Sequence, residues 1–600
     1  MQKHPYGFAF LLSLNPRTPD TYVDKGDAAL LLNRDLVRFS LVREGKRVRA
    51  RILEVLERGT QTVYGQLLAR PSPHIVTPTG DVLAVVGKVP CPSGNWVIAR
   101  IKEYPSKRNE ALVEIEEVFG EKPRPSDDPI IAVAVLGLPN EFPLSVKLEA
   151  RRPPPDDDDS REDLTSLPFV TIDGEDAKDF DDAIHVKSQS GETAWVLSVA
   201  IADVSHYVRP GTALDEQARL RSTSVYFPGH CIPMLPEALS NDLCSLIPDQ
   251  ERLVLVAEMH FDRFGASRHA RFFSAKIRSR ARLTYTEVHK FFNHESVPRL
   301  EPIKDALNHA RSLYKKMRER RTERGALDFD FPEIKFQINA AGVPESVAVA
   351  PRYESHQLIE EFMVAANSCV AERLKDYPAL FRVHESPDPD KLGDLNELLK
   401  TLGISKRLTG FAHADIAPLL EIKNPLLHRA ILRMQRQARY RFEPLGHFGL
   451  ALPDYLHFTS PIRRYPDLHN HRLLKEVLRG LKARNAETED NSTYDLGIET
   501  SDKERRAMEA ERFVVKRKTC WYMMKHVGEE FDALVSDLNN NGIALTLPNG
   551  IEGYIPGEFE YDEKKMRIKI GGEILRWGSP IRVQLVRVDL ELGRLEFHLL

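Results

Sequence analysis

The acidic segment TIDGEDAKDFDDAIHV, residues 171–186, constrains the fold more than any other part of the sequence. Its carboxylates lie too close together to be left without a counter-charge, because crowded carboxylates repel one another and take up protons unless cations neutralise them. Strand-like runs flank the segment on both sides. Neighbouring strands that meet at this loop would aim several carboxylates at one point. The residues placed to converge are Asp173, Asp179, Asp181 and Asp182.

These four aspartates have the chemistry of a magnesium site. Hard oxygen ligands suit Mg²⁺ or Mn²⁺, which usually keep waters and share the phosphate oxygens of a substrate. Two divalent cations would neutralise the roughly four negative charges. The segment therefore predicts a two-ion Mg²⁺ site in which Mn²⁺ could substitute. A solvated acidic turn and a Ca²⁺ loop are alternative interpretations of the same residues.

A second acidic run, RRPPPDDDDSRED at residues 151–163, is expected to behave differently. Three prolines followed by four aspartates are typical of a stiff, solvated linker. Consecutive residues fan out around the backbone, and no strand-like run flanks Asp156 to Asp159. We do not expect a metal site there.

The segment HFTSPIRRYPDLHNHRLL, residues 457–474, is the candidate for the missing positive charge. Ser460 is the expected N-cap of a helix that begins at Pro461. A helix N-terminus attracts phosphate, and Arg463 and Arg464 in its first turn would add forked donors. An arginine placed there can stabilise the extra charge of a phosphoryl transition state. The alternative is that these arginines are ordinary surface residues.

The chain of 600 residues is too long for one hydrophobic core, so several domains are expected. Short β segments fill residues 1–125, where two small barrels would fit. Tyr6, Phe8 and Phe10 alternate along one of them, either as a base-stacking platform or as core aromatics. The middle of the chain mixes strands with long amphipathic helices, and an Asn-Asn-Gly turn predicts a last small barrel. The expected boundaries are 1–57, 58–125, a linker 126–164, 165–525 and 526–600.

Composition and charge restrict the location more than the function. The net charge of -4 and pI near 6.6 do not by themselves indicate a polyanion partner. The five cysteines are scattered, which favours a reducing compartment and argues against a structural zinc site. The apolar run FAFLLSL is too short for a signal sequence, and no run reaches the roughly 20 apolar residues that cross a bilayer. We expect a cytoplasmic protein that does not enter a membrane.

Six ordered motifs give the chain a specific resemblance. They are TIDGEDAKDFDDAI, YFPGHCIPMLPEALSNDLCSL, RGALDF, IEEFMVAAN, GHFGLAL and HFTSPIRRYPDL. In this order they resemble the ribonuclease II / ribonuclease R family of 3′-to-5′ exoribonucleases, closer to the ribonuclease R branch. The resemblance covers the whole chain. It implies a multidomain α+β protein with two N-terminal cold-shock-like OB barrels, a large mixed α/β catalytic domain of the ribonuclease II type, and a C-terminal S1-type OB barrel.

The resemblance also implies roles for individual residues. Asp173, Asp179, Asp181 and Asp182 match the catalytic, metal-binding aspartates, one of the last two acting directly and the other through water or from the far side. Arg463 is expected to contact the scissile phosphate. The remaining expected RNA contacts are the base clamp of Tyr226 and Phe329, the ribose-contacting Tyr285, and Glu511 and Arg464 near the site.

The function implied is processive, metal-dependent hydrolysis of single-stranded RNA from a free 3′ end. Nucleoside 5′-monophosphates would leave one at a time with little sequence preference, and a short oligonucleotide would remain. The chain is expected to act as a monomer. A catalytically silent RNA-binding regulator built on the same scaffold is the alternative, and a DNA-directed or endonucleolytic enzyme is a third hypothesis.

Overall fold

The computed structural model describes residues 1–600 except 4–6, 13–19, 45–46, 107–108, 157, 159, 190, 329–332, 423, 481–490, 563–566 and 571. Tyr6 and Phe329 therefore lie outside the described residues. No helix within the described part of the chain combines the length and apolar character needed to cross a membrane.

Two β units open the chain. In the first, the described strands form a five-stranded sheet in the order β1-β2-β3-β5-β4, whereas the second is a closed barrel in the order β10-β8-β7-β6-β9. A barrel was expected for both, so the first unit differs in the residues that are described. The strands are β1 (Gln2–Lys3), β2 (Ala9–Leu11), β3 (Thr21–Val23), β4 (Leu36–Glu44), β5 (Arg47–Glu57), β6 (Thr62–Leu68), β7 (His74–Val76), β8 (Val82–Val85), β9 (Trp96–Glu103) and β10 (Leu112–Gly120), with the short helix α1 (Lys25–Ala28) after β3.

The aromatic row of the first unit lies on its surface. The rings of Phe8 and Phe10 make an edge contact with centroids 5.7 Å apart, and Tyr22 on the neighbouring strand contacts both. Phe10 and Tyr22 are 37% and 39% exposed. A core row would be buried, so this exposure favours the stacking-platform interpretation.

The segment expected to be a linker is packed into the fold. It contains α2 (Asp128–Leu136) and α3 (Leu144–Ala150). Asp128 is fully buried, and its carboxylate lies 2.7 Å from Arg517 and 3.2 Å from Lys518. Such a buried ion pair holds α2 in one place, so the part of the expected linker that forms α2 is packed against α13.

A seven-stranded sheet is the centre of the catalytic unit. Its order is β11-β18-β17-β14-β13-β12-β19, with β12 antiparallel to β13 and parallel to β19. The C-terminal end of β12 therefore lies beside the start of β13, as expected for the acidic loop between them. The strands are β11 (Glu162–Asp163), β12 (Val170–Asp173), β13 (Asp182–Ser188), β14 (Trp195–Ala202), β17 (Glu251–Phe261), β18 (Ser267–Arg278) and β19 (Ala281–Thr284).

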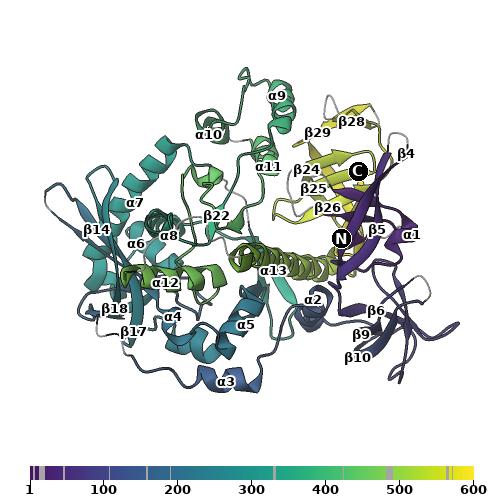
Figure 1. Ribbon diagram of the computed structural model, residues 1–600. Coiled ribbons are helices and arrows are strands. Elements are labelled where there is room, and N and C mark those ends of the chain that lie inside the picture. The colour runs from purple at the N-terminus through teal and green to yellow at the C-terminus, as the bar shows by residue number, and fades with distance from the viewer. Residues whose placement is uncertain are drawn as a thin grey trace.

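Alternating side chains of this sheet enter two cores, because successive residues of a strand point to opposite faces. On β14, Leu197, Val199 and Ile201 pack against the helices α6 (Tyr285–Phe292), α7 (Lys304–Arg324) and α8 (Glu354–Leu374). Ala200 and Ala202 join the second core, with α3 and α5 (Ala213–Arg221). The helix α12 (Tyr465–Leu478) contributes to both cores. Figure 1 shows these helices on the two sides of the sheet.

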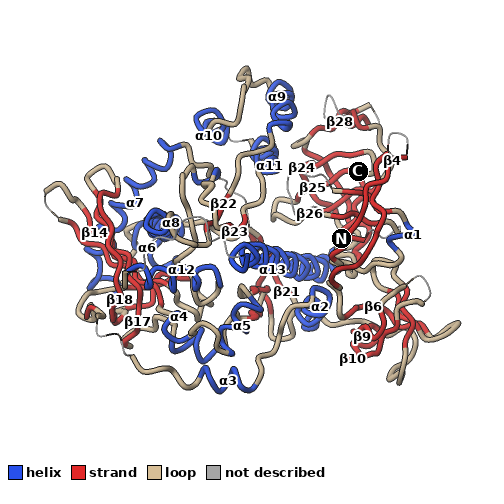
Figure 2. The backbone as a smooth tube through the Cα atoms, in the orientation of Figure 1, coloured by secondary structure: helices blue, strands red, loops and turns tan. Residues whose placement is uncertain are grey.

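The 33-residue helix α13 (Asn491–Met523) crosses the middle of the molecule and joins the catalytic unit to the last barrel (Figure 1). Cys520 and Met523 near its end belong to the core of that barrel. The barrel has the order β24-β25-β26-β31-β30, and the expected Asn-Asn-Gly turn joins its first two strands. Figure 2 shows the last barrel and the two N-terminal β units at the same end of α13.

The remaining elements are the strands β15 (Val225–Phe227), β16 (His230–Ile232), β20 (Ile334–Ile338), β21 (Pro344–Val349), β22 (Phe381–Val383), β23 (Arg439–Arg441), β24 (Glu530–Asn539), β25 (Gly542–Thr546), β26 (Glu552–Pro556), β27 (Tyr561–Asp562), β28 (Arg567–Ile570), β29 (Glu573–Arg576), β30 (Pro580–Asp589) and β31 (Arg594–Leu599), and the helices α4 (Val204–Tyr207), α9 (Leu392–Thr401), α10 (His413–Glu421) and α11 (Pro425–Met434).

Candidate active site

The acidic loop between β12 and β13 is fastened at several points along its length. Phe180 is buried in the second core, and its backbone N–H donates to Ser245 Oγ at 3.0 Å. Near the start of the loop, Arg282 donates to the carbonyl oxygens of Gly174 and Glu175. Anchors on both sides of the aspartates keep their backbone from spreading into solvent, although the carboxylates repel one another.

The carboxylates at this loop lack counter-charge. Asp173 Oδ2 and Asp181 Oδ2 are buried and, in the described part of the chain, have no hydrogen-bond partner. Burial, reinforced by the neighbouring Asp182 carboxylate, raises the pKa of Asp173. Burial likewise raises the pKa of Asp181 and Asp182, although Arg463 opposes the shift at both. These carboxyl groups therefore favour a bound proton or a bound cation over a free charge.

The carboxylate oxygens of the four aspartates are suitable ligands for divalent cations. Unpartnered, buried carboxylate oxygens are costly unless a cation or a proton occupies them. Among the described residues, no three His, Cys, Asp or Glu side chains converge as a ready-made cage for one ion. Mg²⁺ is commonly bound by only one or two carboxylates together with waters and substrate phosphates, so an incomplete protein cage is compatible with it.

The turn that precedes α12 supplies the positive partner. The backbone N–H of Ile462 donates to Asp181 Oδ1 at 2.9 Å, and Arg463 Nε lies 3.8 Å from Asp181 Oδ2. The Arg463 side chain is 44% exposed, so its guanidinium is accessible to a ligand. The predicted helix start is wrong by four residues: α12 begins at Tyr465, and Ser460 to Arg463 form a separate turn.

Arg464 differs from the expectation that it contacts RNA. Its guanidinium makes a bidentate pair with Asp467, with distances of 2.9 and 2.8 Å. Asp467 is fully buried and also accepts the backbone N–H of Ser460 at 2.8 Å. The pair therefore holds the turn that presents Arg463. Sequence reasoning missed Asp467, although its position three residues after Arg464 on a helix start was a usable signal.

Tyr226 and Glu511 join the site from β15 and α13. The Tyr226 hydroxyl donates to Asp179 Oδ2 at 2.7 Å, and its backbone N–H donates to Glu511 Oε1 at 3.1 Å. Tyr226 is 40% exposed, which leaves part of its ring accessible for stacking. Burial raises the pKa of Glu511. The direct link from Tyr226 to a metal-site aspartate was not expected.

Tyr285, the first residue of α6, follows Thr284, which pairs with Asp173 in the sheet, and Asp182 begins the neighbouring strand β13. Burial, together with the charges of these two aspartates, raises the pKa of its hydroxyl. Asp181 instead faces the turn that carries Arg463. Arg463 also opposes the pKa shift of Asp182, so the division of roles expected between Asp181 and Asp182 stays a prediction.

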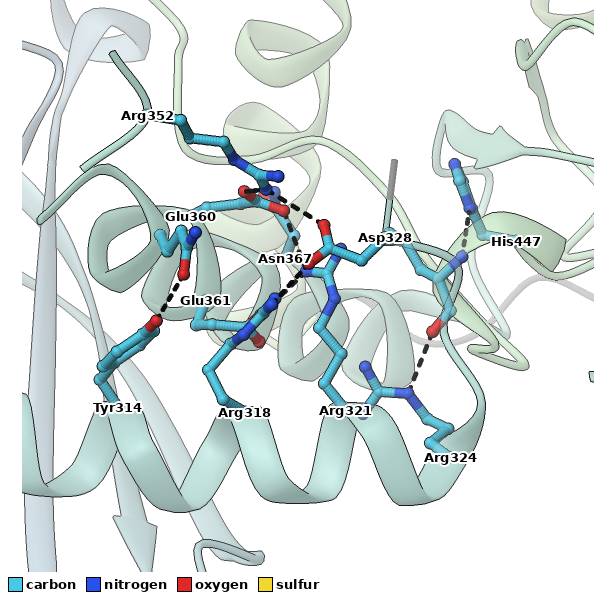
Figure 3. A network of polar contacts seen from close by, with 12 residues as sticks. Tyr314, Arg318, Arg321, Arg324, Asp328, Arg352, Glu360, Glu361, Asn367 and His447 are labelled. Carbon is cyan, nitrogen blue, oxygen red and sulfur yellow. Dashed lines mark hydrogen bonds and ion pairs between the residues drawn. The ribbon is translucent and has the colours of Figure 1, made fainter. Parts of the chain in front are cut away.

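Phe329 lies outside the described residues, but the chain that leads to it is held by a closed ring of ion pairs (Figure 3). Three arginines alternate with three carboxylates around the ring, so its formal charge is balanced. The pairs are Arg318–Asp328 at 2.5 Å, Asp328–Arg352 at 3.2 Å, Arg352–Glu360 at 3.0 Å, Glu360–Arg321 at 2.9 Å, Arg321–Glu361 at 2.9 Å and Glu361–Arg318 at 3.3 Å. The ring explains why a charged residue precedes Phe329 in RGALDF.

A cavity of about 890 Å³ leads to Tyr226 and Glu511 from the outside. One wall is α13, and another comes from the loops and strands of the last barrel. Arg512, Lys516 and Arg594 are the basic residues among those that line it. These three side chains are of the type that binds phosphates, and Glu333, Glu511 and Glu552 line the same cavity.

Comparisons of the sequence with known proteins agree with this geometry. Residues 161–480 match the RNB domain, and residues 87–143 match the cold shock domain, which therefore extends past the expected boundary at 125. Ribonuclease R of Escherichia coli (strain K12) is 35% identical over 640 residues, which cover 100% of this chain and 78% of that protein. Ribonuclease R of Thermotoga maritima is 36% identical over 92% of this chain and 82% of that protein.

Solved structures show the same relationship. RNase R of Mycoplasma genitalium in complex with ribose-methylated single-stranded RNA has a TM-score of 0.88 at 28% identity, covering 100% of this chain and 99% of that one. Yeast Ssd1, described as a pseudonuclease, has a TM-score of 0.72 at 18% identity, covering 94% and 80%. The Ssd1 likeness concerns the fold alone. With a matching RNB domain and ribonuclease R relatives along nearly its whole length, the chain belongs to the ribonuclease R family of 3′-to-5′ exoribonucleases.

Proposed function

We propose that the chain is a processive, metal-dependent hydrolase that removes nucleoside 5′-monophosphates one at a time from the free 3′ end of single-stranded RNA. It acts with little sequence preference and leaves a short oligonucleotide. The observation that carries the proposal is the pair of buried, unpartnered oxygens on Asp173 and Asp181, beside an accessible Arg463. A solvated acidic turn would not leave carboxylate oxygens buried and unpaired.

The four aspartates would hold Mg²⁺, with two positions and with Mn²⁺ able to substitute. When bound, these ions supply neutralising charge and a water of lowered pKa. Asp173 and Asp182 would serve one side of the site and Asp181 the other. Arg463 would donate to the scissile phosphate and stabilise the charge that develops on its oxygens.

Aromatic residues would hold the end of the RNA. Tyr226 and Phe329 would stack on terminal bases, and stacking is tolerant of sequence because every base has a π face. Tyr285 would contact a ribose near the site, where the 2′-hydroxyl distinguishes RNA from DNA. Glu511 would fix the backbone of Tyr226, and the basic residues of the cavity would bind phosphates. RNA is the bound ligand of the Mycoplasma genitalium relative, which supports this assignment.

The silent RNA-binding alternative is not favoured. Ssd1 shows that the fold can exist in a protein described as a pseudonuclease, so the fold alone does not decide activity. The raised pKa values of Asp173, Asp181 and Asp182 support an active enzyme, because a protein that only binds RNA has no need of carboxylates whose charge is destabilised by burial. We further propose that the protein acts as a monomer in the cytoplasm.

The test is an end-labelled single-stranded RNA incubated with the protein and Mg²⁺, with a DNA of the same sequence alongside. We expect mononucleotides and one short end product from the RNA, and no cleavage of the DNA. Fragments of intermediate length at early times would indicate an endonuclease and contradict the proposal. RNA binding without any shortening would favour the silent alternative.

A further inference from the structure

A ladder of stacked rings runs from α8 to the predicted ribose-contacting residue. The rings of His356 and Tyr285 are stacked face to face, with centroids 3.9 Å apart and an interplanar angle of 19°. Behind them, Tyr353 lies 5.6 Å from His356 and stacks on His289 at 4.2 Å. Tyr285 therefore has a flat aromatic support on the face that His356 covers.

The backbone of Tyr285 is fixed separately from its ring. Ser355 is fully buried, and its hydroxyl donates to the carbonyl oxygen of Tyr285 at 2.7 Å. This bond fixes the position of the Tyr285 backbone but leaves its side-chain torsions free. The contact with His356 is what limits the direction of the ring, because a ring stacked at this distance loses contact when it rotates.

The hydrogen bond of His356 fixes its tautomer. His356 is the third residue of α8, and its Nδ1 accepts the backbone N–H of Tyr353, the N-cap, at 3.1 Å. An accepting Nδ1 carries no proton, so the neutral ring has its proton on Nε2. The same side chain thus does two things: it completes the helix cap and it supports Tyr285.

We propose that His356 is a positioning residue that holds the Tyr285 ring against the ribose of the bound RNA and thereby sets the preference for ribose over 2′-deoxyribose. The proposal rests on the proposed function, since it needs an RNA end beside Tyr285. Asp173 pairs in the sheet with Thr284, the residue before Tyr285, so a ribose held by this ring would lie near Asp173.

The two tasks of His356 can be separated by substitution. Gln and Glu are the usual residues at the third position of a capping box, so His356→Gln keeps an acceptor for Tyr353 but removes the ring. His356→Phe keeps a ring and removes the acceptor. A purely structural role in the cap predicts that Phe is the damaging change, whereas the proposed role predicts that Gln is.

The experiment measures single-turnover cleavage of matched oligoribonucleotides that carry one 2′-deoxyribose at each of the last few positions in turn. Tyr285→Phe first marks the position at which the ribose preference depends on Tyr285. At that position we expect His356→Gln to lower the ribose-to-deoxyribose rate ratio about three- to tenfold, the range of one lost aromatic contact, and His356→Phe to keep it within about twofold. His356→Asn provides a second ringless variant if His356→Gln does not fold.

An unchanged ratio in the ringless variants, or a loss confined to His356→Phe, would overturn the proposal while leaving the exoribonuclease assignment intact. If Tyr285→Phe changes no ratio, the ribose contact is wrong and so is the role of His356. A wild-type chain that does not shorten RNA from its 3′ end would instead overturn the proposed function, and the positioning role with it.

Discussion

Two acidic regions of the same chain differ in the counter-charge that surrounds their aspartates. Near residue 156, Asp156 lies 2.8 Å from Arg161 and 3.0 Å from Lys276. Asp203, which Arg161 also contacts at 2.8 Å, lies 2.5 Å from Lys475. At the loop 171–182, the ion pair found among the described residues is the longer one between Asp181 and Arg463, at 3.8 Å. The first region is neutralised by the protein itself, and the second is not.

The pKa shifts record this difference. Burial alone would raise the pKa of Asp203, but Lys475 and Arg161 hold it well below its usual range. Burial raises the pKa of Asp173, Asp181 and Asp182, and no comparable set of cations reverses the effect. An acidic cluster is therefore informative about function when its counter-charge is missing, because stability alone favours pairing.

The largest expected effect is that of Asp182→Asn. Removing one charge from the unneutralised region should lower the cleavage rate about 10³-fold, the effect of losing a group that acts on transition-state charge. RNA binding should be retained or tightened, because less negative charge faces the phosphate. Cleavage of labelled RNA and a filter-binding measurement test both parts.

Asp158→Asn in the other acidic region is the matched control for Asp182→Asn. Asp158 accepts the backbone N–H of Ser160 at 3.2 Å and its hydroxyl at 2.5 Å, away from the aspartates of the site. We expect its cleavage rate to stay within about twofold of wild type, since surface substitutions usually have small effects. Equal losses in both variants would mean that the comparison of the two regions is wrong.

Asp203→Asn should damage stability and not chemistry. It leaves Arg161 and Lys475 without their shared carboxylate, and breaking a buried pair costs about 3–5 kcal/mol. Because the folded-state pKa of Asp203 is lowered, its stabilising contribution is present above the unfolded pKa of about 3.9 and is lost as pH falls through the lower folded value.

The measurement for Asp203→Asn is urea unfolding of wild type and variant at several pH values. The difference should be the same at pH 7 and pH 5 and should shrink in more acid solution. A difference that grows as the pH falls from 7 to 5 would contradict the sign of the shift. Any remaining folded variant should cleave RNA at close to the wild-type rate.

Part of the secondary structure and the candidate site residues could be predicted from the sequence. The periodic patterns predicted the strands around the acidic loop and long amphipathic helices in the middle of the chain, because burial on one face imposes a period that the sequence must carry. The aspartates and Arg463 were predicted as one site from local spacing and the family motifs. The structure places Ile462 and Arg463 beside Asp181, and the metal-binding and catalytic roles of the four aspartates stay predictions.

What the sequence did not reveal depends on long-range pairing. Asp156 was predicted to be solvated, but Lys276, which neutralises it, lies on a distant strand. Arg464 was predicted to bind RNA because its partner Asp467 was not identified, although the two are only three residues apart. The ring contact between Tyr285 and His356 joins two helices that are far apart in the sequence, and no local pattern predicts it.

The adjacent arginines Arg463 and Arg464 differ in the same way, because one is accessible and the other is paired with a buried aspartate. Arg463→Gln should lower the cleavage rate about 10²-fold with little change in stability, because its side chain is accessible and its role is toward transition-state charge. Arg464→Gln should mainly destabilise the fold, by about 2–3 kcal/mol, because it leaves the buried Asp467 without its paired cation. Kinetics and thermal unfolding on both variants separate the two. A large loss of stability in Arg463→Gln would reverse the assignment.

The smallest expected change in stability is the one caused by adding Mg²⁺. If the loop 171–182 lacks counter-charge, Mg²⁺ should stabilise the folded protein in the absence of RNA, by about 1.4 kcal/mol at ten times its Kd. Chelation should reverse the shift and stop cleavage. The thermal unfolding midpoint of wild type should therefore rise by a few degrees on addition of Mg²⁺, and Asp158→Asn should respond in the same way. Asp182→Asn should respond less, because one of the repelling carboxylates is gone. An equal Mg²⁺ shift in Asp182→Asn and wild type would place the bound cations elsewhere and remove the physical distinction between the two acidic regions.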